Sequence, residues 1–176
     1  DAGELTQDEI RRGLNRGILD GQLCPVILGS ALQNVAVDRL LWLARAFPHD
    51  GERRPPAGHA PGDPATPVEI LGSPDAPFAA LCIKTHIDPY AGQVSVLRVV
   101  DGAADASTTC LNPRTERPER LNHLTHAAGR GLHPVDRVLP GDIVVVPKLR
   151  DTATGDTLCS PSRRVVLPYV EPPPAM

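Results

Sequence analysis

The first apolar residues of the chain recur at helical spacing. Ile10, Leu14 and Ile18 lie four positions apart, which is the spacing of one face of an α-helix. Thr6 and Glu9 precede this stripe in the form of a capping box, in which each residue satisfies a backbone amide of the other. The pattern therefore predicts a helix that begins after Thr6.

A strand and a second helix are expected next. The short apolar run Leu23–Leu28 is bounded by turn-forming residues and predicts a buried strand. The apolar stripe from Val37 to Phe47 predicts a helix that begins near Asn34, a good capping residue, and that Pro48 ends. Residues 1–48 thus have the order helix, strand, helix.

The pattern changes to strands in the second half of the chain. Six apolar runs are separated by Gly, Pro, Asn and Asp, and they are Phe78–Thr85, Gln93–Val100, Thr108–Leu111, Glu119–His126, Asp142–Val146 and Val165–Tyr169. Short strands at this spacing favour a closed antiparallel barrel, because closure removes exposed edges. We expect a mainly β fold: a six-stranded antiparallel barrel preceded by an α/β remnant.

Proline and glycine mark the boundaries between these parts. Residues 49–66 hold almost nothing apolar and predict an exposed linker. The predicted organisation is residues 1–48, the linker 49–66, the barrel 67–170 and a proline-rich tail 171–176 that begins another linker.

Composition narrows the possible settings and partners. The net charge of −3 gives no global electrostatic case for nucleic acid, so DNA is not expected and any RNA contact needs a local patch. The four cysteines form no CxxC pair, which favours a reducing, cytoplasmic setting. No apolar run approaches the roughly 18 residues of a membrane span, so no membrane partner is expected.

The candidate chemical groups give little support for catalysis. His123, His126 and His133 are spaced suggestively for a metal, but residues three apart on a strand face opposite sides, so we expect surface histidines and no metal. Asp151 and Asp156 are typical of turns. The sequence contains no GxxxxGK[ST] phosphate loop, so we assign no catalytic residue.

The order of residues carries a family resemblance. The run Leu149–Cys159, preceded by Gly141-Asp142-Ile143, closely resembles the end of domain II of translation elongation factor G. Upstream, Pro77–Leu81 and Asp88-Pro89-Tyr90 match the first two strands of that domain. Gly29-Ser30-Ala31-Leu32 matches the family's fifth guanine-nucleotide motif. The chain is thus similar to the end of the GTPase domain followed by domain II, and is expected to be a fragment.

The resemblance implies a function for the parent protein. It would be a translational GTPase that binds GTP and Mg²⁺ and acts on the ribosome in translocation or recycling. Ser30, Ala31 and Leu32 would form the guanine edge, where the Ala31 amide contacts the guanine oxygen. The residues of this chain alone, without a phosphate loop, are expected to be inactive.

The resemblance also implies an RNA partner, because domain II of the family lies against small-subunit RNA. Arg114, Arg117 and Arg120 are the candidate contacts for ribosomal RNA. Glu116 and Glu119 interleave with these arginines, and the alternative is a solvated surface of mixed charge.

Departures from the family pattern leave the parent's task open. Gln33–Ala36 replaces a basic Lys-Asn-Lys-Gly, and Ala127-Ala128 replaces a Met-His pair. The parent is either the main translocase or a divergent paralogue. Two alternatives stand beside it: a non-catalytic β-barrel module that binds RNA or protein, and a ribosomal-protection or release-factor-like GTPase.

Overall fold

A computed structural model describes residues 4–46, 57–88, 92–129 and 131–170. The chain divides into two compact units, Asp1–Arg53 and Arg54–Met176, which are treated separately below. The border between them falls inside the segment 49–66.

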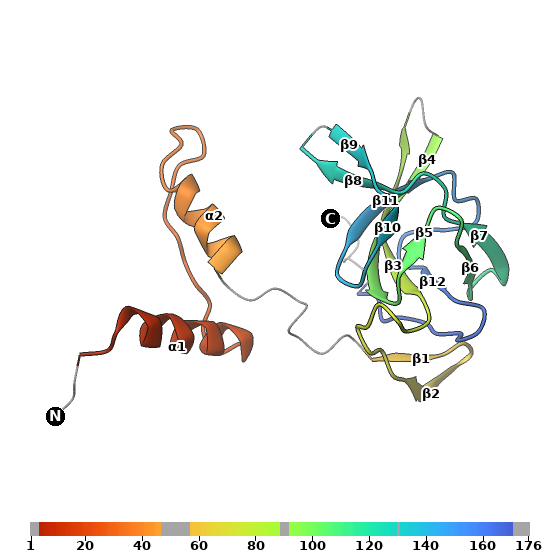
Figure 1. The fold of residues 1–176 in the computed structure, drawn as a ribbon, viewed down its shortest axis with the longest axis horizontal. Helices are drawn as coiled ribbons and strands as arrows, with labels where there is room; N and C mark the ends of the chain where they lie inside the picture. The colour runs from red at the N-terminus through yellow and green to blue at the C-terminus, as the bar shows by residue number, and fades with distance from the viewer. Residues whose placement is uncertain (1–3, 47–56, 89–91, 130, 171–176) are drawn as a thin grey trace, which may run out of the picture. The chain divides into compact units, whose positions relative to one another are not determined.

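The first unit begins with the helix that the sequence predicts. Helix α1 spans Gln7–Leu19 (Figure 1). The capping box is formed: the Glu9 amide donates to Thr6 Oγ1 at 3.3 Å, and the Thr6 amide donates to Glu9 Oε2 at 2.8 Å. The predicted start of the helix is confirmed, because the signal that sets it lies within four consecutive residues.

The predicted strand Leu23–Leu28 is wrong. The segment has no strand assignment, and Val26 and Leu28 are 83% and 88% exposed. A strand needs a neighbour for its backbone hydrogen bonds, and none of the described residues of this unit pairs with the segment. Its apolar character is that of a strand, but no described residue of this unit supplies a strand partner.

The second helix begins later than predicted. Helix α2 spans Val37–Ala46. Asn34 and Ala36 have φ of 55° and 59°, in the left-handed region, so the chain turns there before it enters the helix. The predicted end at Phe47 and Pro48 lies outside the described residues.

The second unit is built on one antiparallel sheet, and the prediction of a mainly β fold is confirmed. Its strand order is β7-β6-β12-β3-β4-β11-β8-β9 (Figure 1). The strands span Ala79–Asp88 (β3), Gly92–Asp101 (β4), Thr109–Asn112 (β6), Arg117–Arg120 (β7), Thr125–Ala128 (β8), Gly131–Pro134 (β9), Ile143–Pro147 (β11) and Thr157–Cys159 (β12).

Two short strand pairs complete this unit. β5 (Ala104–Asp105) pairs with β10 (Arg137–Val138). β1 (Gly58–Ala60) and β2 (Asp63–Val68) form a hairpin, so residues 58–66 are not the linker that was predicted. Pro64 and Pro67 suggested a linker, but an edge strand tolerates proline because one side of its backbone needs no partner.

Two further strand predictions need correction. The run Glu119–His126 is two strands, β7 and β8, separated by a bend where His123 has a φ of 53°. The run Val165–Tyr169 forms a single bridge, Val166 to His59, and not a strand of the sheet. The short strand β12 follows the polar turn after β11.

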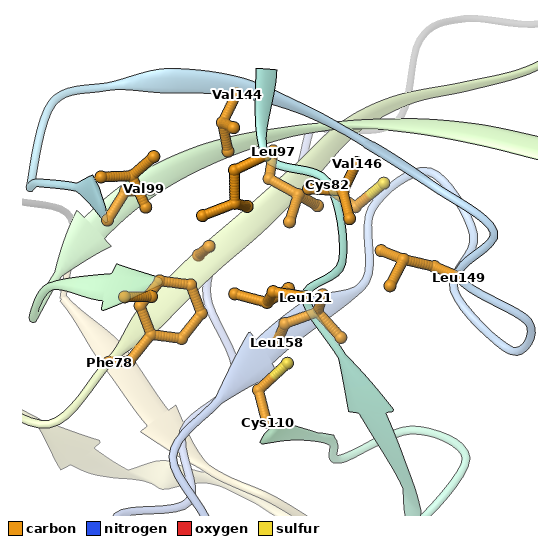
Figure 2. Close-up of a cluster of buried hydrophobic side chains, with 14 residues drawn as sticks. Phe78, Cys82, Leu97, Val99, Cys110, Leu121, Val144, Val146, Leu149 and Leu158 are labelled. Carbon is orange, nitrogen blue, oxygen red and sulfur yellow. The ribbon is translucent and has the colours of Figure 1, made fainter. Parts of the chain in front are cut away.

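The core lies within the curl of the sheet. Figure 2 shows Phe78, Leu97, Val144 and Leu158 among the side chains that converge from β3, β4, β11 and β12 and from the segment leading into β3. A second, smaller cluster consists of Ile70, Ala79, Val100, Cys159, Val165 and Leu167. The β unit therefore has two cores. The larger lies inside the curl of the sheet, and the smaller joins Ile70, after β2, to Val165 and Leu167 near the end of the described chain.

We expect the larger core to dominate the stability of the β unit. Leu97 is fully buried, and Leu97→Ala should lower the free energy of unfolding by about 2–5 kcal/mol through lost burial and a residual cavity. Ile87 is 85% exposed, so Ile87→Ala is the matched control and should change little. Urea denaturation measures both variants, and equal losses would contradict this placement of the core.

Candidate functional site

The turn that holds the predicted guanine-edge residues is closed by its own backbone. The Ser30 amide donates to the Val35 carbonyl oxygen at 3.1 Å, and the Val35 amide donates back to Ser30 at 2.9 Å. Gly29 is required, because a Cβ there would lie 2.7 Å from the Val35 carbonyl oxygen. Ser30, Ala31 and Leu32 follow in sequence, and Leu32 is fully exposed. Ala31 and Leu32 are exposed and Ser30 is half-buried, on a turn that two backbone hydrogen bonds close.

Asp156 is a buried carboxylate of the β unit that joins the end of β6 and the segment after it to the loop before β12. Asp156 is 6% exposed, and its oxygens accept from Arg114 Nε at 2.5 Å and Arg114 Nη2 at 2.8 Å. Asn112 Nδ2 and the Ala153 amide donate to Asp156 Oδ2 at 2.9 Å and 2.8 Å. Burial alone would raise the pKa of Asp156, but these hydrogen bonds outweigh it and hold the pKa below its ordinary value.

Glu119 is the second buried carboxylate of this region. Its oxygens accept from the Arg150 amide at 3.2 Å, the Asp151 amide at 2.7 Å and Thr152 Oγ1 at 2.9 Å. Glu119 thus holds residues 150–152 of the loop between β11 and β12, and Asp156 holds the end of that loop through the Ala153 amide. Glu119 was not predicted to hold a loop, because a glutamate interleaved with arginines is typical of a mixed-charge surface.

The three arginines predicted to contact RNA have different surroundings. Arg114 is bound to Asp156, and Arg117 Nη1 forms an ion pair with Asp151 Oδ1 at 3.0 Å. Arg120 is exposed, on the strand face opposite the buried Glu119. All three arginines are exposed, and the structure gives Arg114 and Arg117 acidic partners within the chain.

A shallow hollow of about 490 Å³ lies beside this loop. Its lining includes Thr85 and His86 from β3, Gln93 from β4, and Arg114, Arg150 and Thr152. Gln93 Nε2 donates to the Thr152 carbonyl oxygen at 2.7 Å, which ties the hairpin β3–β4 to the loop. Asp151 also lines the hollow, and the Arg114 guanidinium is paired with Asp156, so the charge of the hollow is mixed.

Comparisons with known proteins bear on both units. Residues 77–161 match the family model "Elongation factor G domain 2". The chain is 32% identical over 164 residues to elongation factor G of Ureaplasma parvum serovar 3, covering 93% of this chain and 24% of the relative. The same identity and coverage are found for elongation factor G of Ureaplasma urealyticum serovar 10. The chain is similar to elongation factor G over most of its length.

The structural comparison agrees with this similarity. A crystal structure of a protein from Thermus thermophilus superposes with a TM-score of 0.70 and 25% identity, over 97% of this chain and 23% of that protein. The chain therefore spans about a quarter of the length of the relatives that it matches.

Histidines and cysteines are the remaining candidate groups of the β unit. His126 and His133 lie opposite each other on β8 and β9, but no group of three or more potential metal ligands comes together among the described residues. Burial raises the pKa of the Cys82 thiol to about 11 and that of Cys110 to about 12, so both stay protonated at neutral pH.

Neither described helix has the length and apolar character that crossing a membrane requires.

The buried Asp156 should make stability depend on pH. Because its folded pKa is lowered, its contribution is present above the unfolded value of about 3.9 and is lost as the pH falls through the folded value. We expect Asp156→Asn to cost about 1–3 kcal/mol of unfolding free energy at pH 7, with the difference shrinking below about pH 4.

Chemical denaturation at a series of pH values measures this effect. Asp75→Asn, at an exposed turn residue, removes the same charge and serves as the control. A cost for Asp156→Asn that stays constant from pH 7 to about pH 3 would contradict the role of the ionised carboxylate.

Proposed function

We propose that this chain is part of a translational GTPase that acts on the ribosome in protein synthesis. The match of residues 77–161 to domain 2 of elongation factor G is the observation that carries the proposal. The 32% identity extends it, because the aligned region covers 93% of the chain and so includes most of the first unit. We infer that residues 1–48 are the end of the GTPase domain and that domain II extends to residue 170.

The first unit would supply the guanine edge of the nucleotide site. Ser30 and Ala31 are small residues on an exposed turn, which allows a purine edge to approach the backbone where larger side chains would block it. GTP and Mg²⁺ are the ligands of the complete protein, which would hold the phosphates and the metal through residues outside this chain. GTP hydrolysis is thus proposed for the parent, with Ser30, Ala31 and Leu32 serving base recognition only.

The β unit would contact ribosomal RNA. Arg120 is exposed on an edge strand, and Arg150 lines the hollow beside the loop that Glu119 holds. Arg114 and Arg117 are neighbours of this surface, and their ion pairs with Asp156 and Asp151 fix the loop. Phosphate contacts by arginine need little more than exposure and a fixed backbone.

The 176-residue chain should neither bind GTP measurably nor hydrolyse it. The sequence contains no GxxxxGK[ST] loop, so nothing in it cradles the phosphates or places Mg²⁺. Isothermal titration calorimetry with Mg²⁺ and GTP measures the affinity, and the parent protein is the positive control. Micromolar binding by the chain alone would contradict this assignment of the nucleotide site.

Removal of an arginine that binds RNA should reduce the salt dependence of ribosome binding. We expect Arg120→Gln and Arg150→Gln in the parent protein each to lower the slope of log K against log salt by about 0.7–0.9 for each phosphate that is no longer neutralised. Arg11→Gln, on an exposed part of α1, removes the same charge as a control. Unchanged slopes for both variants would favour a solvated surface of mixed charge.

A further inference from the structure

The first and last described segments of the β unit are hydrogen bonded to each other. The His59 amide donates to the Val166 carbonyl oxygen at 3.0 Å, and the Val166 amide donates to the His59 carbonyl oxygen at 2.9 Å. These two residues lie near opposite ends of the unit in sequence. The segment that leads into the sheet and the segment that leaves it thus form an antiparallel bridge.

The bridge is tightly packed at Gly58. A Cβ at Gly58 would lie 2.3 Å from Val165 Cγ2, and Val165 is fully buried. Val165 and Leu167 share the smaller core cluster with Ile70, which follows β2. The incoming and outgoing segments therefore bury their apolar side chains against one another as well as against the sheet.

Polar contacts fix the outgoing segment further. The Leu167 amide donates to Thr157 Oγ1 at 2.8 Å, inside the buried region. Arg163 Nη2 donates to the Pro77 carbonyl oxygen at 2.8 Å and to the buried Asp101 Oδ2 at 2.5 Å. Arg163 Nη1 reaches the Glu69 carbonyl oxygen at 3.3 Å, which is on the incoming side.

We propose that these two segments form a clasp that opens and closes as one unit. The clasp consists of β1, residues 165–167 and the contacts between them. β1 and β2 lie outside the eight-stranded sheet, and the bridge holds them to the outgoing segment through two backbone hydrogen bonds. Such a peripheral group can open at a lower free energy than the sheet that it covers.

The consequence is mechanical coupling between the two ends of the β unit. A displacement of the incoming segment opens the bridge and frees the outgoing one, and linkage makes the effect reciprocal. The proposed function assigns no role to either segment, so this coupling stands independently of ribosome binding. It would let the part of the protein before residue 57 bias the part after residue 170.

Amide hydrogen exchange on the 176-residue chain tests the coupling. Gly58→Ala places a methyl group against Val165, so exchange at the Val166 and Leu167 amides should accelerate about tenfold or more. The amides of β11 should keep their protection and report that the sheet is folded. Gly13→Ala, where a Cβ meets nothing, should change none of these amides.

The reciprocal variant decides the proposal. Thr157→Val removes the hydroxyl that accepts from Leu167, and it should accelerate exchange at the His59 amide on the incoming side. Acceleration at Leu167 with His59 unchanged would overturn the coupling. Loss of β11 protection in both variants would also overturn it, because the clasp would then open only with the whole sheet.

Discussion

Three buried carboxylates constrain the loops of the β unit. Asp101, Glu119 and Asp156 are at most 6% exposed, and burying an ionised carboxylate costs several kcal/mol unless hydrogen bonds replace its water. Each carboxylate accepts hydrogen bonds from donors on a loop. Asp101 takes the amides of Leu71 and Ser73, at 3.2 Å and 3.1 Å, besides Arg163.

The composition explains why these polar anchors matter so much. Aromatic residues make up 3% of the chain, and the larger core is mostly Val, Leu, Ala and Cys. Aliphatic packing is strong but has little directional preference, so it fixes where the sheet curls and leaves the loops undetermined. Hydrogen bonds to a buried carboxylate are directional, and an orphaned partner is costly, so they select one conformation for each loop.

Local signals explain most of what the sequence predicted correctly. The capping box of α1 lies within four residues, and the apolar runs of β3, β4 and β11 are each visible in their own stretch of sequence. The errors are non-local. Hairpin β1–β2 resembles a linker until Val166 pairs with it, and Glu119 resembles a surface residue until the loop at 150–152 folds over it. Neither partner can be identified from spacing along the chain.

The candidate site shows the same limit. Family resemblance indicated the guanine-edge turn, and no periodicity would have found it. The family resemblance also indicated the arginines. All three are exposed, and only the structure shows that Arg114 and Arg117 pair with Asp156 and Asp151. A phosphate contact and an internal ion pair draw on the same residue type, so sequence alone cannot distinguish a surface that binds RNA from one that fixes its own loop.

The exposed run Leu23–Leu28 completes the contrast between the units. Its composition is that of a buried strand, yet each large apolar side chain left in water forfeits roughly 1.5–3 kcal/mol. Only Gly17 of α1 and no residue of α2 is buried, so the described part of the first unit leaves Val26 and Leu28 largely uncovered. Under the proposed function, the rest of the GTPase domain would supply the neighbouring strands. The β unit needs no such help, because its own segments pair with and cover one another.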